Sequence, residues 1–250
     1  NMTQRAKLNR LGLELVGDIS HPEHMAIFTV PFRAAIALKR PLLFFGENPQ
    51  EQYGGPPGTE DARQLTLRWR SEFGGFLGLR PDDLALMAGD MGYYTPPTAD
   101  ELERYGVEAH FLGQYIGPWD SDRNSKVAME NGMQAALPTS ANFWESENLD
   151  CAMTGIHDHM MFRKYGYGRG VAQISVDVRK GKISRESAMR WVEGADGLFP
   201  HTYAGVTIEE VLNRLGMKRR ELDVIMDRFT NKDLFSGKVD RCSPILKEFA

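Results

Sequence analysis

The sequence predicts an α/β fold in which a small parallel sheet is followed by a helical C-terminal region. Two short apolar runs, at residues 41–46 and 107–116, have the length and the flanking Pro or Gly residues that are typical of buried strands. Beyond about residue 145 the apolar residues recur at helical spacing instead. We therefore expect an α/β domain over residues 1–140 and a helical domain over residues 141–250.

The N-terminal part is expected to begin with helices and to reach its first strand near Pro41. Leucines among basic and polar residues predict a helix over residues 4–16. A second helical stretch covers residues 23–39, and Pro31 should kink it or start a new helix, because proline lacks the amide hydrogen that a helix interior needs. We expect the run from Pro41 to Gly46 to form a strand that is buried on both faces.

The second strand is expected to follow a well-capped helix. Thr98 and Glu101 have the spacing of a capping box, and Gly106 lies where a helix commonly ends. Residues 107–116 then form the strand, which leads into a loop at 117–120. Since ligands of open α/β sheets bind at the carboxyl ends of the strands, the loops after both strands are candidate binding sites.

The C-terminal part shows helical spacing and helix caps. Leu149, Met153, Ile156 and Met160 follow steps of four, three and four residues, which predicts one buried helix face. Further helices are expected from a cap at Ser184, a capping box at Thr207 and Glu210 with Gly216 as the stop, and a last apolar pattern over residues 222–229.

Composition excludes several classes of protein. The chain carries 30 basic and 34 acidic side chains, a net charge of −4, so no general attraction to nucleic acid or to an anionic membrane is expected. No apolar window is long enough to span a bilayer, and no secretory signal is visible. The two cysteines are too few for a disulfide scaffold, and we expect a cytoplasmic protein.

The first candidate site is the loop at residues 46–55, after the first predicted strand. It holds two carboxylates, three amides and a phenol, and its glycines would let backbone amides approach a ligand closely. The same composition also suits a solvated surface loop, and composition by itself leaves both interpretations open.

The second candidate site lies around residues 155–169. On a helix, His157, Met161 and Lys164 share one flank. From Arg163 to Arg190 there are eight basic and two acidic residues, an excess that suits a polyanion such as a nucleotide or pyrophosphate, although basic residues on solvated helix faces would look the same.

Other catalytic classes find less support. Histidines at 21, 24, 157 and 159, with nearby carboxylates, suggest a divalent-metal hydrolase, but no His-Glu-x-x-His spacing occurs. The chain has no nucleophile elbow around a serine and no Gly-x-Gly-x-x-Gly or Gly-x-x-x-x-Gly-Lys phosphate loop.

Five motifs in order, with compatible spacing, resemble the N-acetyl sugar amidotransferase family. They are Gly-Glu-Asn-Pro-x-x-x-Tyr-Gly-Gly at 46–55, Gly-Ile-His-Asp at 155–158, Lys-Tyr-Gly-Tyr-Gly-Arg at 164–169, Asp-x-Arg-x-Gly-Lys-Ile-Ser-Arg-Glu at 177–186, and Asn-Lys-Asp-Leu-Phe at 231–235. The likeness extends over nearly all of residues 5–236.

The resemblance implies a PP-loop ATP pyrophosphatase with a partial HUP-type parallel sheet, and ATP and Mg²⁺ as cofactors. In that chemistry ATP adenylates the carbonyl oxygen of an acetamido group on a sugar or nucleotide-sugar and releases pyrophosphate. Ammonia from a separate glutaminase subunit then displaces AMP and leaves an acetamidino group. Adenylation makes the oxygen a leaving group, and the site must exclude water, which would restore the amide.

The resemblance also implies two groups of site residues. The catalytic residues are expected to be His157, Asp158 and Lys164. The residues expected to bind nucleotide and substrate are Glu47, Asn48, Tyr53, Trp119, Asp120 and Arg169. Of these, Lys164 and Arg169 would hold phosphate charge, and no protein-bound metal is expected.

The chain departs from the family pattern in one important respect. It has no Ser-Gly-Gly-Lys-Asp-Ser pyrophosphate loop, which is expected upstream of the matched region, and Ser20 and His24 stand where some members have cysteines. The alternatives are therefore a non-catalytic sugar-nucleotide-binding subunit of a split amidotransferase and, behind it, the metal hydrolase. An incomplete sheet should also pair with a further segment, a partner or a second copy in a homo-oligomer.

Overall fold

The computed structural model describes residues 1–46, 63–116, 120–136, 141–236 and 245–246, which form two compact units. Unit 1 comprises Asn1–Asn9 and Ser20–Ser121, and unit 2 comprises Arg10–Ile19 and Asp122–Ala250. The domain boundary expected at residue 140 falls outside the described residues, so it stays a prediction. Among the described residues, no helix is both long and apolar enough to cross a membrane.

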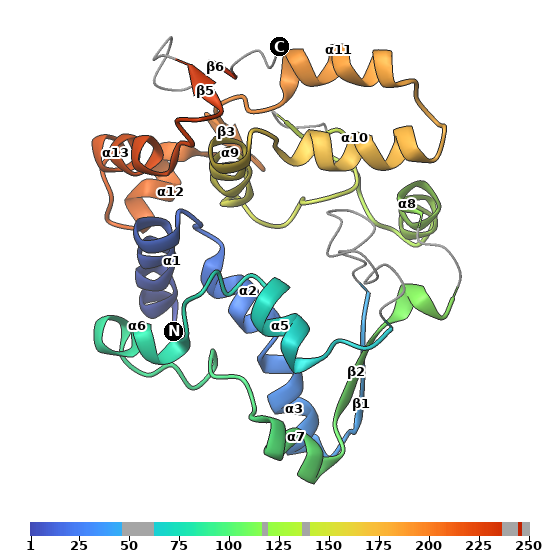
Figure 1. The fold of residues 1–250 in the computed structure, drawn as a ribbon, viewed down its shortest axis with the longest axis vertical. Helices are drawn as coiled ribbons and strands as arrows, with labels where there is room; N and C mark the ends of the chain where they lie inside the picture. The colour runs from blue at the N-terminus through green and yellow to red at the C-terminus, as the bar shows by residue number, and fades with distance from the viewer. Residues whose placement is uncertain (47–62, 117–119, 137–140, 237–244, 247–250) are drawn as a thin grey trace. The chain divides into compact units, whose positions relative to one another are not determined.

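Unit 1 packs helices against a short two-stranded sheet (Figure 1). Its elements are α2 (His21–Ile27), α3 (Val30–Leu38), β1 (Leu42–Phe45), α5 (Leu67–Phe73), α6 (Pro81–Ala88), α7 (Ala99–Tyr105), β2 (Glu108–Phe111) and a 3₁₀ turn over Leu112–Gln114. The helix α1 (Met2–Val16) runs through the first residues of unit 1 into unit 2. The predicted interruption near Pro31 is confirmed, because α2 ends before Phe28 and Pro31 lies in the first turn of α3.

The two strands of unit 1 are parallel, as the sequence predicts. Leu42 lies opposite Glu108, and Phe45 lies opposite Phe111. The helix before β2 begins at the capping box of Thr98 and ends at Gly106, whose φ of 61° is the left-handed conformation that glycine adopts easily. Local hydrogen bonds therefore set the point at which β2 begins. The strand is shorter than the predicted 107–116, because the backbone turns into the 3₁₀ helix after Phe111.

The sheet is covered on one face. Phe45, Ala109 and Phe111 belong to a buried cluster with Phe32 and Ala35 of α3. The prediction that the first strand is buried on both faces is wrong for the described residues, since Leu42 and Phe44 point the other way and are each 52% exposed. Only one layer of described helices packs on the sheet, whereas parallel sheets are normally covered on both faces.

The outer edge of β2 is occupied by a segment that precedes α5. The amide of Leu65 donates to the carbonyl of Ala109 (2.8 Å), and the amide of Phe111 donates to the carbonyl of Arg63 (2.9 Å). Gln64 and His110 form the antiparallel bridge between these bonds. Among the described residues no strand pairs with the outer edge of β1, so a further strand could add to the sheet at this edge.

Unit 2 is mainly helical, as expected for the C-terminal part. Its elements are α8 (Ser121–Glu130), α9 (Thr154–Tyr165), α10 (Arg169–Arg179), α11 (Arg185–Ala195), β3 (Thr202–Tyr203), β4 (Val206–Thr207), α12 (Ile208–Arg214), α13 (Arg219–Phe229), β5 (Phe235–Ser236) and β6 (Ile245–Leu246). The predicted caps at Ser184 and Thr207 are confirmed. The predicted stripe is only half helical, because α9 begins at Thr154 and Leu149 and Met153 precede it.

The close packing of α10 and α11 (Figure 1) depends on one glycine. A Cβ atom built on Gly170 would lie 2.3 Å from the ring of Trp191 and 2.9 Å from the carbonyl of Ala141. Any other residue at this position would force the two helices apart. Gly170 directly follows the Lys-Tyr-Gly-Tyr-Gly-Arg motif, so this packing also fixes where the motif's last arginine lies.

Candidate functional site

Four of the predicted site residues come together in unit 2 with an aspartate that sequence reasoning missed. We call this group the α9 cluster: His157, Asp158 and Lys164 on α9, Arg169 at the start of α10, and Asp18 in the turn after α1. Residues 157 and 164 share one flank of α9, as their spacing predicts. The turn that holds Asp18 lies against this flank.

Asp18, which is buried, and His157, which is partly buried, form a hydrogen-bonded pair. The Asp18 carboxylate lies 2.7 Å from Nδ1 of the His157 ring, and its side chain is only 7% exposed. Burial by itself would lower the pKa of His157, but the charge of Asp18 and its hydrogen bond outweigh burial, so the pKa of His157 is raised. A carboxylate at Nδ1 keeps the proton on that nitrogen, which makes Nε2 the acceptor of the neutral ring.

Lys164 is attached to the same turn. Its Nζ donates to the carbonyl of Val16 at 2.5 Å and lies 5.5 Å from the centre of the Phe229 ring. Burial lowers the pKa of Lys164, and the charge of Asp18 opposes that change. Gly17 makes the turn possible, because its φ is +63° and a Cβ there would lie 2.7 Å from the Phe229 ring and 2.9 Å from Cε of Lys164.

Asp158 and Arg169 form a second buried pair. Nε of Arg169 lies 3.2 Å and 3.4 Å from the two carboxylate oxygens of Asp158, and Nη2 lies 3.0 Å from Oδ1. Both charges act on the neighbouring ring, since Asp158 raises and Arg169 lowers the pKa of His157. The guanidinium that was expected to hold a phosphate is therefore engaged by a carboxylate of the same cluster.

Asp196 is a second acid that sequence reasoning missed. It directly follows α11, and its carboxylate contacts the first turn of α10. Its Oδ2 accepts a hydrogen bond from the backbone amide of Gly168 at 2.7 Å. Burial, together with the charge of Asp158, raises the pKa of Asp196 to about 6, although the amides of Gly168 and Val171 favour the charged form. A group with such a pKa can hold or release a proton near neutral pH.

His159 belongs to the protein core and not to the site. Nδ1 lies 3.1 Å from the carbonyl of Gly197, and Nε2 accepts from Nε of Arg163 at 2.8 Å. Burial and the nearby charge of Arg163 lower the pKa of His159 to about 3, so the ring is neutral. Arg163 also donates to Thr230 at 2.9 Å and so ties α9 to the end of α13. Both ring nitrogens are used, which leaves His159 without a lone pair for a metal.

The structure brings no metal site together among the residues it describes, where no group of three His, Cys, Asp or Glu side chains is arranged to hold an ion. His21, from the other suggested stretch, is fully buried, and its Nε2 lies 2.9 Å from the carbonyl of Phe76.

Five of the predicted site residues remain. Glu47, Asn48, Tyr53 and Trp119 lie outside the described residues. Asp120 belongs to unit 1, where it directly precedes α8 and is half-buried.

No pattern in the sequence identified Asp18 or Asp196 as a site residue. Asp18 is 139 residues from His157, and nothing in the local pattern marks either acid. An alignment with paired changes at positions 18 and 157 could have revealed the contact.

Several side chains of the basic stretch of unit 2 already have partners within that unit. Arg163 and Arg169 are buried with internal partners, Lys182 pairs with Asp122, and Arg190 pairs with Glu186 (2.7 Å). For these residues the structure favours a role in packing and solvation over an open polyanion site.

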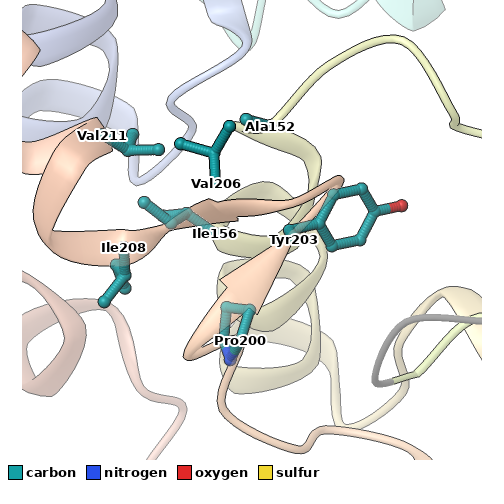
Figure 2. Close-up of a pocket in the computed structure, with 7 residues that line it drawn as sticks. All are labelled: Ala152, Ile156, Pro200, Tyr203, Val206, Ile208 and Val211. Atoms are coloured by element: carbon teal, nitrogen blue, oxygen red, sulfur yellow. The ribbon is translucent and has the colours of Figure 1, made fainter.

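The hollow drawn in Figure 2 is not a substrate site. It lies near the start of α9, between that helix and the β3–β4 hairpin with α12. Its volume is about 170 Å³, and it is too narrow to hold a water molecule. The only polar side chain that lines it, Tyr203, turns its hydroxyl away from the aliphatic residues (Figure 2). That hydroxyl accepts from Asn142 at 2.7 Å and donates to the carbonyl of Asn148 at 3.2 Å.

Comparison with known families gives a match to the C-terminal half of the chain. Residues 138–245 are similar to the family described as LPS biosynthesis protein WbpG-like, C-terminal domain. The match contains α9, α10 and every member of the α9 cluster except Asp18. A search of curated proteins found no match to the chain.

Proposed function

We propose that this chain is part of an ATP-dependent N-acetyl sugar amidotransferase of lipopolysaccharide or related polysaccharide biosynthesis. The similarity of residues 138–245 to the C-terminal domain of LPS biosynthesis proteins carries this proposal. The matched range is also the range in which His157, Asp158, Lys164 and Arg169 gather into one buried cluster of charges. Buried, mutually interacting titratable groups are typical of active sites.

The proposed reaction has two steps. The acetamido carbonyl oxygen attacks the α-phosphorus of ATP, and the bond to the departing pyrophosphate breaks. Ammonia then adds to the activated carbon, the nitrogen loses a proton, and the C–O bond breaks so that the oxygen leaves with AMP. The product carries an acetamidino group in place of the acetamido group.

His157 is suited to accept the proton that the adding ammonia must lose. Asp18 orients the ring by its hydrogen bond to Nδ1 and raises the pKa of His157, which makes Nε2 the stronger base. In this proposal Asp18 is a positioning residue, since it acts through His157.

Arg169 and Lys164 would serve the reaction through the charge and shape of the site. Arg169 holds Asp158 by the bidentate contact, and Lys164 holds the turn that contains Asp18. A developing phosphate charge would compete with Asp158 for Arg169, and Asp196 at the start of α10 could take up a proton near neutral pH.

The nucleotide phosphates would be held mainly by a pyrophosphate loop on further strands of a HUP-type sheet. The outer edge of β1 and the half-exposed Leu42 and Phe44 support a sheet that extends beyond the described strands. The described residues offer no ligand cluster for Mg²⁺, and we assign no step to that ion. A glutaminase subunit would supply the ammonia.

The test is a product assay on the purified protein with ATP, an ammonium salt and a UDP-N-acetyl sugar. The proposal predicts AMP and pyrophosphate in equal amounts, formed only when both the sugar and ammonia are present. Mass spectrometry should show that an imino nitrogen has replaced the acetamido oxygen. Release of ADP, or AMP formation that does not depend on the acetamido group, would contradict it.

A pair of variants connects the activity to the α9 cluster. His157→Gln is expected to lower kcat by about a hundredfold or more, in line with the loss of a general base. His201→Gln is the control, because His201 is an exposed histidine of the same unit and no member of the cluster. Equal activity of both variants would remove His157 from the mechanism.

A second candidate is a non-catalytic subunit that binds a sugar nucleotide for a partner chain. The engagement of Arg169 by Asp158 favours it, since an arginine already paired is a poor phosphate ligand. Calorimetry distinguishes the two candidates: the subunit should bind a UDP-N-acetyl sugar without ATP and form no AMP with ammonia present.

A further inference from the structure

Arg70 of α5 is the most fully buried arginine in the described chain, with 2% of its surface exposed. Its Nη1 donates a long hydrogen bond of 3.3 Å to the carbonyl of Phe28, and its guanidinium rests on the Phe32 ring with a separation of 4.1 Å. The two remaining donor atoms, Nε and Nη2, are buried and have no hydrogen-bond partner among the residues that the structure describes. Buried polar atoms without a partner are rare, and for a cation the cost is greater.

The unpaired donors lie on one edge of the guanidinium. Nε–H and one Nη2–H of arginine point the same way and together form the fork that holds two oxygens of a carboxylate or phosphate. Arg169 uses this same edge, Nε and Nη2, to hold Asp158. Of these two buried arginines, Arg169 has this edge filled by a carboxylate, whereas the same edge of Arg70 has no partner among the described residues.

No described carboxylate compensates the charge of Arg70. Burial is the only influence on its pKa, which falls to about 10, whereas a nearby acid would raise it. The described acids of unit 1 that pair with arginines are Glu23, Glu101 and Asp83, and their partners are Arg5, Arg33 and Arg80.

The surroundings of Arg70 are the carboxyl ends of the two strands. Phe28 and Phe32, which Arg70 contacts, both pack their rings against Phe45, the last residue of β1, at 5.8 Å and 6.0 Å. Its neighbour Trp69 packs on Phe111, the last residue of β2, at 5.2 Å. Ligands of parallel sheets bind at this end.

We propose that the Nε/Nη2 edge of Arg70 is a binding site for an oxyanion, a phosphate group or a carboxylate, which accepts both hydrogen bonds. The inference goes beyond the proposed function and does not depend on it, because it stands on the empty fork in unit 1. Arg70 is almost completely enclosed by its neighbours. Side chains around α5 must shift for an anion to enter.

The test measures thermal unfolding of the protein with inorganic phosphate, AMP or acetate, each against chloride at equal ionic strength. Binding to the folded state should raise Tm in a saturable way, by about 5 °C at a roughly hundredfold excess over Kd. A rise with phosphate and AMP identifies a phosphate site, and a rise with acetate alone identifies a carboxylate site. No rise with any of the three would overturn the proposal.

Arg70→Met should abolish the anion-dependent rise, and Arg68→Met should keep it. Arg68 is the matched control, because it is an exposed arginine on the same helix. An equal rise in Arg70→Met would place the anion elsewhere and overturn the proposal.

If Arg70→Met does not fold, the Nε–H signal of Arg70 in the ¹⁵N-labelled wild-type protein decides the matter, with Arg70→Lys for assignment. A downfield shift that saturates at the same anion concentration as the Tm rise supports the site. An unchanged signal during that rise refutes it.

Discussion

Arg169 in unit 2 and Arg70 in unit 1 are both buried, but only Arg169 has a carboxylate partner among the described residues. Arg169 offers its Nε/Nη2 edge to Asp158, and the surrounding cluster balances the charges of Asp18, His157 and Lys164 as well. Arg70 lies among aromatic rings with the same edge unpaired. Burial of a charge stabilises a fold only when a partner comes with it, so the difference separates a cluster that is complete from a group that lacks its partner.

The largest expected effect comes from removing each arginine in turn. Arg169→Met leaves Asp158 buried without its cation and should lower the free energy of unfolding by about 3–5 kcal/mol. Arg70→Met removes a buried charge that no described carboxylate balances, and it should raise the free energy of unfolding by about 1 kcal/mol in the absence of anions. Urea unfolding followed by circular dichroism measures both.

The double variant Asp158→Leu/Arg169→Met is the control for this pair. It removes both charges and should recover most of the stability that Arg169→Met loses. A loss of similar size in Arg70→Met and Arg169→Met would show that the two arginines are equivalent and would break the comparison.

The next effect tests the turn that completes the α9 cluster. Gly17→Ala should lower the free energy of unfolding by about 3 kcal/mol, because φ is +63° and the new Cβ would collide with the Phe229 ring. Gly216→Ala, at φ +61° with open space around it, should cost only about 1 kcal/mol. Equal losses would mean that Phe229 moves aside easily and that the turn is not held tightly.

Asp196 should make the stability of unit 2 depend on pH. The pKa of Asp196 is raised from 3.8 to about 6, so folding favours the protonated carboxyl. The contribution of this group to the free energy of unfolding is therefore complete below pH 3.8 and is lost as the pH rises through about 6. The difference in stability between wild type and Asp196→Asn should therefore change across this range. Asp150→Asn, an exposed aspartate of the same unit, is the control and should show no such change.

The smallest effect concerns the Asp18–His157 pair. The pKa of His157 is raised above 6.5, so the pair stabilises the fold fully below that pH and less as the pH rises through the raised pKa. Asp18→Asn should cost more stability at about pH 6 than at about pH 8. His157→Gln should show the same trend, and a cost independent of pH in both variants would contradict the assigned protonation.

The parts of the fold that the sequence predicted are those with local causes. The caps at Thr98, Ser184 and Thr207 depend on residues within one turn of each other. The two strands after α3 and α7 were predicted from their own apolar runs, although their pairing joins residues that are far apart in the sequence. The expected burial of both faces of β1 failed, because that depends on which other segments pack on the strand.

The candidate site divides in the same way. The motifs identified His157, Asp158, Lys164 and Arg169, and the structure brings these four together. They did not identify which acid contacts which base. That Asp158 fills the fork of Arg169, and that Asp18 reaches His157, follows from the packing of α9 against α10 and the turn after α1.

By itself the sequence determined the helix caps at Thr98, Ser184 and Thr207 and which residue types could form a site, because hydrogen bonds between near neighbours set those caps. Only the tertiary structure decided which charges are paired. Asp18 meets His157 across 139 residues, and Arg70 is left with an empty fork among aromatic rings. The reason is physical: the energy of a buried charge depends on the oxygens or nitrogens within about 3 Å of it, and folding alone brings those atoms near.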